Sequence, residues 1–212
     1  GARHMWDWSE NQIELIMIRH GATKANEEHR YLGNTDESLS VQGITILQKE
    51  KNNGTYPMID KLFTSPMKRC IQTAEILYPD IQPVIIPDWQ EMDFGDFEGK
   101  NYQDLQEDPR YQKWIDSNGT LPFPNGESRE NFIKRSKQGL YAMCKELSKT
   151  VRSADMKHVV IGMIVHGGTI MALLSSFYGG EYFDHQTANG KGYCCKLCCD
   201  GKHIHFEDLR EL

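Results

Sequence analysis

The segment Arg19-His20-Gly21 contains the residue types needed to bind and transfer a phosphoryl group. A histidine has a pKa near neutrality and can act as a nucleophile, while an arginine offers a planar fork of donors that fits phosphate oxygens. The glycine lets the backbone approach a ligand. A lone Arg-His-Gly also fits a turn with a hydrogen-bonded histidine, so its meaning depends on the rest of the chain.

A second histidine, His166, stands in the same kind of position as His20. Ile13 to Ile18 and His158 to Val165 are apolar runs typical of strands buried on both faces, and one of the two histidines follows each run. In open α/β sheets, ligands bind beyond the carboxyl ends of the strands. Both histidines are therefore candidates for one site.

Four ordered motifs make the sequence resemble the histidine phosphatase superfamily, which includes cofactor-dependent phosphoglycerate mutases and many phosphatases. They are Arg19-His20-Gly21 with Thr23 and Asn26, Ser65 to Glu75, Gln90 to Gly99, and Val165 to Gly168. The resemblance spans most of the chain, from Ile13 to about Leu197. Within the family, the segment Phe94 to Gly99, followed by Asp108-Pro109 and Trp114, is most similar to the α-ribazole phosphatase-like branch.

The resemblance implies a role for each motif. In the family the first histidine becomes a phosphohistidine, and the arginine of the second motif binds the phosphoryl group. The first acid of the third motif donates a proton, and the last histidine contacts the transferring group. The predicted catalytic residues are thus His20, Glu91 and His166, and the predicted phosphate-binding residues are Arg19, Asn26, Arg69 and Gly167.

Elementary chemistry supports these roles independently. The transition state spreads charge over three oxygens, which two arginines, His166 and Asn26 could stabilise. An alkoxide leaving group needs a proton, and apolar neighbours could raise the pKa of Glu91 so that it supplies one and then activates water. Glu98 is the first alternative donor, and Asp93 and Asp96 are interpreted as solvated or structural. This scheme needs no metal ion and no cofactor.

Three functions are compatible with such a site, namely hydrolysis, mutase activity and non-catalytic binding of phosphorylated ligands. A non-catalytic module would be expected to lack one of the reactive residues, and all are present. In the mutases, a longer insertion with paired arginines covers the pocket and excludes water. Here the stretch between Glu91 and Glu127 is short, and its basic residues are not adjacent: Lys100, Arg110 and Lys113. We therefore expect a more open pocket and a phosphatase, with α-ribazole 5'-phosphate as one candidate substrate.

The cysteines near the C-terminus could be read as a metal site. Disulfide frameworks belong to short secreted chains, so reduced thiols are expected. The cluster Cys194 to Cys199 precedes Asp200-Gly201, which favours a two-residue hairpin turn. On a strand, Cys195 and Cys199 face one way while Cys194 and Cys198 face the other, each pair about 13 Å apart. Four sulfurs so placed cannot close around zinc, and His203-x-His205 falls in the predicted hairpin, so no metal site is predicted.

Alternating apolar runs predict an α/β protein of three layers, α/β/α, with a mostly parallel central sheet and a C-terminal β-hairpin. Residues 6–212 are expected to form one domain after a tag remnant at residues 1–5. Gly126 to Ser128, with Phe132 and Arg135, is interpreted as a structural helix start. Further strands are expected at Lys61 to Thr64 and Val84 to Ile86, and helices at Gln42 to Lys49, Met67 to about Leu77 with Ser65 as cap, Tyr102 to Trp114, Glu127 to Ser148, and from Gly167 through Phe177.

The net charge of -6 argues against a nucleic-acid partner, because nucleic-acid modules usually gather Lys and Arg into a basic face. No apolar run approaches the roughly 20 residues that cross a bilayer, and no signal-peptide pattern opens the chain. We therefore expect a cytoplasmic protein without membrane contact, whose partner is a small phosphomonoester substrate. Nothing in the sequence specifies an oligomeric state.

Overall fold

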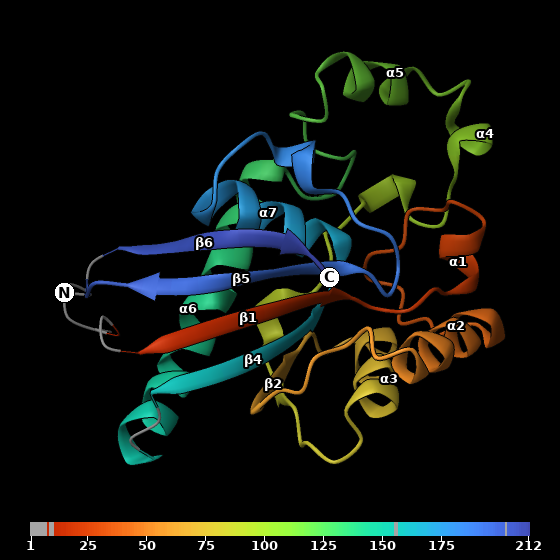
Figure 1. The fold of residues 1–212 in the computed structure, drawn as a ribbon. Helices are drawn as coiled ribbons and strands as arrows, with labels where there is room; N and C mark the ends of the chain where they lie inside the picture. The colour runs from red at the N-terminus through yellow and green to blue at the C-terminus, as the bar shows by residue number, and fades with distance from the viewer. Residues whose placement is uncertain (1–7, 9–10, 155–156, 202) are drawn as a thin grey trace.

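A six-stranded sheet forms the centre of the molecule (Figure 1). The computed structural model describes Trp8 and residues 11–154, 157–201 and 203–212, so the expected tag remnant at residues 1–5 lies outside the described residues. The strands are β1 (Gln12–Arg19), β2 (Lys61–Thr64), β3 (Val84–Ile85), β4 (His158–Val165), β5 (Gly192–Cys199) and β6 (Ile204–Glu211). Their order across the sheet is β3-β2-β4-β1-β5-β6. The first four pair in parallel, and β5 and β6 add an antiparallel edge, which confirms the expected sheet and hairpin.

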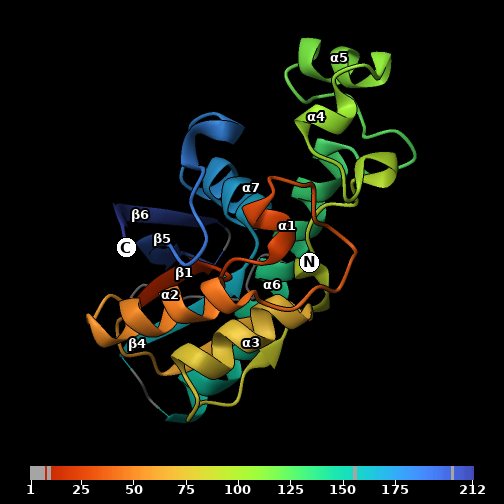
Figure 2. The same cartoon turned by 90° about the vertical axis from the view of Figure 1, so that its right-hand side faces the viewer.

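Helices cover both faces of this sheet and complete the expected three-layer fold (Figures 1 and 2). The helices are α1 (Lys24–Glu27), α2 (Val41–Asn52), α3 (Lys68–Leu77), α4 (Tyr102–Leu105), α5 (Pro109–Asp116), α6 (Arg129–Ala154) and α7 (Gly167–Phe177). Helices α2 and α3 pack on one face, and α6 and α7 pack on the other. None of the described helices is long and apolar enough to cross a membrane.

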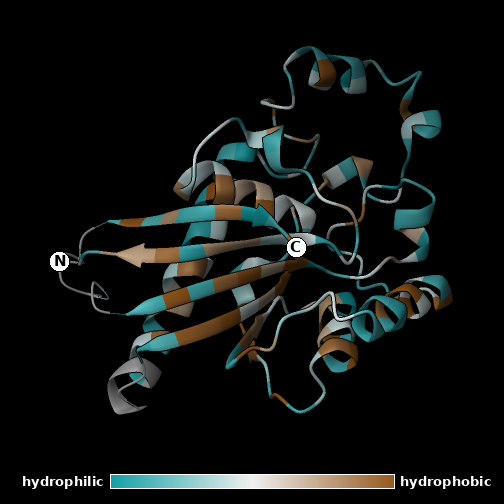
Figure 3. Cartoon of the chain, in the orientation of Figure 1, coloured by the Kyte–Doolittle hydropathy of each residue, from teal (hydrophilic) through white to brown (hydrophobic). Residues whose placement is uncertain are grey.

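Strand β1 shows why its apolar run is continuous. Leu15 and Met17 belong to the core beneath α6 and α7, while Ile16 and Ile18 belong to the core beneath α2 and α3. No side chain from Leu15 to Ile18 faces water, so the alternation of polar and apolar residues disappears. Figure 3 shows the same hydrophobic banding on β1 and on the neighbouring β4.

The parallel strands bring several chain segments to one edge of the sheet. Strands β1 and β4 are paired so that Arg19 lies beside Val165, and β2 pairs with β4 on its other side. The residues that follow these three strands therefore meet at the same edge. Helices α4 and α5 stand beyond this edge, away from the sheet (Figure 2).

The stretch from Tyr102 to Trp114, predicted as one helical segment, is divided into α4 and α5. The break falls at Asp108, whose side chain accepts a hydrogen bond from the backbone N–H of Arg110 at 2.9 Å and so caps α5. Pro109 takes the first position of α5, where its missing N–H costs nothing. Capping chemistry thus overrides the helical spacing of the apolar residues.

Two other helix ends also differ from the expectation. Helix α3 begins after Met67, which has no side-chain cap, and the Ser65 hydroxyl accepts the Met67 N–H and also contacts His166. Helix α6 begins at Arg129 rather than at Glu127 and continues past Ser148. The Glu127 carboxylate accepts hydrogen bonds from Arg135 rather than capping the helix. In both cases the side chain expected at the helix start has a further partner, which is His166 of another element for Ser65 and Arg135 of α6 itself for Glu127.

The C-terminal hairpin reverses slightly later than expected. Cys199 pairs with Ile204, and the Asp200 N–H donates to the His203 carbonyl at 3.4 Å, so the tip falls after Asp200 rather than at Asp200-Gly201. Lys202 lies outside the described residues. The predicted alternation of the cysteines is confirmed for Cys195, Cys199 and Cys194, since the first two enter one core and the third enters the other. All six cysteines are free thiols, as expected.

Candidate active site

The two histidines singled out by the sequence lie side by side at the sheet edge. His20 follows β1 and His166 follows β4, and their ring centroids are 5.2 Å apart with the planes at 70°. His20 is 3% exposed, and His166 is fully buried. Burial and the guanidinium groups of Arg69 and Arg19 hold the pKa of His20 well below its usual value. The imidazole of His20 is therefore neutral at neutral pH.

A backbone carbonyl determines which nitrogen of His20 is reactive. His20 Nδ1 lies 2.7 Å from the Gly21 carbonyl oxygen, which can only accept, so Nδ1 carries the proton. The lone pair is then on Nε2, as nucleophilic attack requires. Gly21 itself serves packing rather than ligand approach, because a Cβ there would lie 2.6 Å from Leu47 Cδ1. Its N–H donates to Thr73 Oγ1 at 3.0 Å and holds the turn in place.

Ser65 favours in His166 the same tautomer as in His20. Ser65 Oγ accepts the Met67 N–H at 3.2 Å and lies 2.8 Å from His166 Nε2. The hydroxyl can donate its proton to Nε2, and His166 then carries its own proton on Nδ1. Sequence reasoning interpreted Ser65 as a helix cap. Its place directly after β2, at the same edge as the two histidines, was the signal that could have identified it.

Arg69 is held as a fixed donor by a loop that precedes α2. Its guanidinium is fully buried, and it donates to the carbonyl oxygens of Thr35 at 2.8 Å and Gly33 at 2.9 Å. The Glu98 carboxylate accepts the N–H groups of Gly33 and Thr35 and so ties down the same loop. Glu98, which the sequence analysis named as the first alternative proton donor, thus fixes the loop whose carbonyl oxygens hold Arg69.

Three buried donors lie close to His20 without an acceptor among the described residues: Arg19 Nε, Arg69 Nε and His166 Nδ1. Another nitrogen of Arg19, Nη1, donates a hydrogen bond to the Thr187 carbonyl oxygen at 2.8 Å. Burial lowers the pKa of Arg19. Each unpaired buried donor costs about 1–3 kcal/mol. Such a concentration of unpaired donors and positive charge around a neutral nucleophile fits an anionic group such as phosphoryl.

Glu91 is the carboxyl group of the site and has the properties of an acid. Burial raises its pKa, and this effect outweighs the hydrogen bond from the Met92 N–H and the charges of Arg69 and Arg19, which lower it. Its second oxygen accepts the Gly168 N–H at 3.4 Å. A Cβ on Gly168 would lie 2.5 Å from Glu91 Oε1, so only glycine leaves room for the carboxyl group.

An ion pair that sequence reasoning treated as part of a helix start holds the backbone around Glu91. Arg135 and Glu127 are joined through two hydrogen bonds of 2.9 and 3.0 Å. Arg135 also donates to the carbonyls of Asp88, Gln90 and Glu91, at 2.8 to 3.2 Å. The pair thus holds the backbone that carries Glu91, the predicted proton donor.

Asn26 and Gly167, two predicted phosphate-binding residues, have different surroundings. The side-chain oxygen of Asn26, Oδ1, accepts the Thr23 N–H at 3.1 Å in a capping box. It also accepts a hydrogen bond from the side-chain amide Nδ2 of Asn189 at 3.1 Å. Only the Nδ2 amide of Asn26 is therefore available for a phosphoryl oxygen. Gly167 begins α7 and lies against Arg19, where a Cβ would stand 3.3 Å from Nε. Asn189, which also donates to the His20 carbonyl, had no signal in the sequence.

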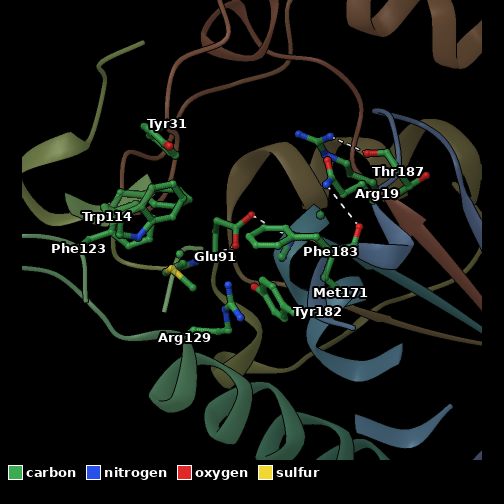
Figure 4. A pocket seen from close by; sticks show the side chains of 16 residues that line it. Arg19, Tyr31, Glu91, Trp114, Phe123, Arg129, Met171, Tyr182, Phe183 and Thr187 are labelled. Carbon is green, nitrogen blue, oxygen red and sulfur yellow. Dashed lines mark hydrogen bonds between the residues drawn. The ribbon is translucent and has the colours of Figure 1, made fainter. Parts of the chain in front are cut away.

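A cavity of about 230 Å³ opens beside this site, with Arg19, Glu91, Gly167 and Gly168 in its lining (Figure 4). Half of the remaining lining residues are aromatic: Tyr31, Phe94, Trp114, Phe123, Tyr182 and Phe183. In Figure 4, Trp114 and Phe123 lie across the cavity from Arg19, with Glu91 between. The segment between Glu91 and Glu127 thus supplies three of these rings, namely Phe94, Trp114 and Phe123.

One arginine also borders the cavity, and sequence reasoning did not name it. Arg129, at the start of α6, places its guanidinium 4.7 Å from the centroid of the Tyr182 ring and 5.0 Å from that of Phe183. The three basic residues of the preceding segment are absent from the lining. Of these, Arg110 pairs with Asp96 and Asp108 at the surface.

Comparison with known proteins identifies the family. The profile of the histidine phosphatase superfamily (branch 1) matches residues 15–209. The adenosylcobalamin/alpha-ribazole phosphatase of Escherichia coli (strain K12) is 31% identical over 173 residues, covering 79% of this chain and 80% of that protein.

Solved structures show the same fold. The alpha-ribazole phosphatase from Shigella flexneri aligns with a TM-score of 0.69 at 24% identity, covering 92% of this chain and 95% of that one. The phosphoglycerate mutase from Thermus thermophilus aligns with a TM-score of 0.64 at 27% identity, covering 93% and 99%. The fold and the matching profile define an α/β phosphatase. The chain belongs to the histidine phosphatase superfamily.

Proposed function

We propose that this protein hydrolyses small phosphomonoesters through a phosphohistidine at His20. The observation that carries the proposal is the cluster of unpaired buried donors around a histidine whose Nε2 holds the lone pair. Arg19, Arg69 and His166 would neutralise the charge on the three phosphoryl oxygens. The same chemistry needs no metal ion, because protein groups supply every positive charge.

The reaction has two steps, and Glu91 gives up one proton in the first and regains one in the second. First, His20 Nε2 attacks phosphorus, the N–P bond forms, and the bond to the ester oxygen breaks as Glu91 gives that oxygen its proton. Glu91 is then a carboxylate, and it takes a proton from water as the water oxygen attacks phosphorus and the N–P bond breaks. The products are an alcohol and inorganic phosphate, and both side chains return to their starting states.

The aromatic residues of the cavity support a substrate whose leaving group presents a planar or apolar face. A cavity lined by six aromatic rings can bind such a group by stacking and burial of apolar surface. An α-ribazole 5'-phosphate, with its fused aromatic base, is one candidate with this property, and the E. coli relative carries that substrate in its name.

The experiment that tests the mechanism traps the intermediate. Rapid quenching with labelled substrate should yield a phosphoenzyme that is stable to alkali and labile to acid, and His20→Ala should remove it. His158→Ala, an exposed histidine at the start of β4, is the matched control and should leave the label in place. Full turnover by His20→Ala, or loss of activity in EDTA restored by zinc or magnesium, would refute the mechanism.

A second assay separates phosphatase from mutase. The protein is incubated with 3-phosphoglycerate plus 2,3-bisphosphoglycerate, and separately with a panel of phosphomonoesters that includes α-ribazole 5'-phosphate. We expect phosphate release from the panel, fastest with aromatic leaving groups. Formation of 2-phosphoglycerate at mutase-like rates without phosphate release from the panel would contradict the proposal.

A further inference from the structure

The hairpin of β5 and β6 carries a second group of reactive side chains, far from the active site. Cys198 faces His205 directly across the two strands, and Glu207 lies two residues further along β6, on the same face. This part of β5 lies beside the start of β1, whereas His20 follows its end. The length of β1 therefore separates the two groups, a distance of about 25 Å.

The three side chains converge on one another. Their ligating atoms, a sulfur, an imidazole nitrogen and a carboxylate oxygen, all lie within 4.8 Å of one another. His205 Nε2 is 2.9 Å from Glu207 Oε1, and the Cys198 thiol hydrogen-bonds to the same carboxylate. A thiol proton and an imidazole proton thus occupy the space between three atoms that could instead share a cation.

The surroundings allow an ion to enter from solvent. The three residues border a cavity of about 210 Å³ that also includes Asp200. The side chains of His205 and Glu207 are 47% and 49% exposed, whereas Cys198 is half-buried. The sulfur is therefore sheltered while the other two ligands can adjust.

This donor set has the chemistry of a zinc site. Zinc binds thiolate, imidazole and carboxylate at about 2.0–2.3 Å in tetrahedral geometry, and hard cations such as magnesium prefer oxygen alone. Ligand atoms of such a tetrahedron stand roughly 3.3–3.8 Å apart, so small side-chain rotations close the observed cluster. We propose that Cys198, His205 and Glu207 form a zinc-binding site, with water as the fourth ligand. It takes one thiol from the cysteine cluster and its other ligands from the facing strand, which avoids the geometric obstacle to a four-cysteine site.

A bound zinc ion would join β5 to β6 and stabilise the edge of the sheet. Because the site is remote from His20, phosphatase activity should not depend on it. Lys196 pairs with Glu207 across the hairpin and places a positive charge beside the site. Removing that charge should strengthen the binding of a cation. A Lys196 variant should therefore bind zinc more tightly, whereas variants of the three ligands should bind it more weakly.

The experiment titrates the reduced, metal-free protein with zinc against a chromophoric chelator, and repeats the titration with cobalt(II). The native chain should bind one equivalent, and cobalt should show a near-ultraviolet thiolate charge-transfer band. Cys198→Ser, His205→Ala and Glu207→Gln should each weaken zinc binding by at least about tenfold. Cys198→Ser should also abolish the cobalt band, and Lys196→Gln should tighten binding severalfold. The matched control, His158→Ala, should change nothing.

Thermal unfolding gives a second readout of the same site. Zinc should raise the melting temperature of the native chain and of His158→Ala, because a ligand that binds the folded state shifts the folding equilibrium toward that state. It should not raise the melting temperature of Cys198→Ser, which lacks the thiolate ligand. Phosphatase activity should be equal in all these variants. Unchanged zinc affinity in Cys198→Ser, or no zinc binding by the native chain at micromolar concentrations, would overturn the proposal and leave the proposed catalytic function untouched.

Discussion

The cavity of this protein joins two regions that are built in different ways. One is the phosphoryl floor, made of Arg19, His20, Arg69 and His166, whose side chains are held by backbone carbonyls and one serine. The other is the aromatic wall, made of Tyr31, Phe94, Trp114, Phe123, Tyr182 and Phe183.

The floor and the wall differ in what holds them. Arg19, His20 and His166 stand at the ends of the paired strands β1 and β4, and Arg69 is held at the start of α3 by carbonyl oxygens of the loop before α2. The wall comes from loops and short helices, and its rings contact one another edge-on or tilted, as Trp114 and Phe123 do at 4.9 Å between centroids. We therefore expect the phosphoryl floor to determine the reaction and the aromatic wall to determine which leaving groups bind.

The floor should tolerate change least, and Arg69 tests this most severely. Arg69→Met should lower kcat/KM by about 10³-fold for every phosphomonoester, since it removes a fixed donor to the transferring group. Steady-state kinetics on alkyl and aryl substrates measure this. The control is Arg110→Gln, which loses two surface ion pairs and a contact with the Phe97 ring, all outside the phosphoryl floor.

A thermal melt of the Arg69 variant is needed alongside the kinetics, because this arginine also holds the loop from Leu32 to Thr35. Arg69→Lys keeps the positive charge but loses the planar set of guanidinium N–H donors, so its rate should lie between those of the native chain and Arg69→Met. If the loss in Arg69→Met depends strongly on the leaving group, the division between floor and wall is wrong.

Glu91 stands between the floor and the wall, and its effect should depend on the substrate. Glu91→Gln should slow alkyl phosphates by about 10²–10⁴-fold and p-nitrophenyl phosphate far less, because an aryl leaving group needs little protonation. Parallel assays on both substrates measure the ratio. Equal losses of rate on both substrates would show that a group other than Glu91 donates the proton.

The pKa values of His20 and Glu91 predict the pH profile. Since burial lowers the pKa of His20, activity should fall only when the pH drops well below 6.5 and His20 gains a proton. Since burial raises the pKa of Glu91, activity on alkyl phosphates should fall on the alkaline side as Glu91 loses its proton. In Glu91→Gln the alkaline limb should disappear while the acid limb remains. Comparison on the same substrate removes the contribution of the substrate's own ionisation.

Ser65 tests whether the floor depends on tautomers. Ser65→Ala should lower kcat by about 10- to 100-fold, less than the loss of a donor outright, because His166 can then place its proton on Nε2. Ser65→Thr keeps the hydroxyl and should restore most of the rate. Nitrogen NMR of the His166 ring reports the tautomer directly, and an unchanged Nδ1–H signal in Ser65→Ala would rule out this positioning role.

The wall should give the smallest effect and the most selective one. Trp114→Ala should raise KM about tenfold for esters with aromatic leaving groups and leave kcat nearly unchanged, since stacking contributes equally to ground and transition states. Substrates with small alkyl leaving groups should be unaffected. Tyr102→Ala, an exposed aromatic residue of α4 outside the cavity, is the control. A fall in kcat for all substrates would show that the wall acts on the reaction itself.

Several features could be derived from the sequence because they depend on neighbours in the chain. The continuous apolar runs of β1 and β4 required strands buried on both faces, and that burial placed His20 and His166 at one edge of a parallel sheet. The motifs around them identified the family before any contact was known. The alternation of the cysteines followed from the period of a strand.

Only the tertiary structure decided the features that depend on partners distant in the chain. The Ser65 hydroxyl contacts His166 from another element as well as the Met67 N–H, and the Glu127 carboxylate pairs with Arg135, eight residues further along the chain. Arg129 enters the cavity although its place in the sequence carries no periodicity or motif, since the folding of the segment before α6 brings it there. Within the predicted hairpin, the structure also decided the register, because reversal after Asp200 pairs Cys198 with His205, whereas a turn at Asp200-Gly201 would pair it with His203. Local patterns record backbone geometry and burial, whereas these contacts depend on which elements pack together.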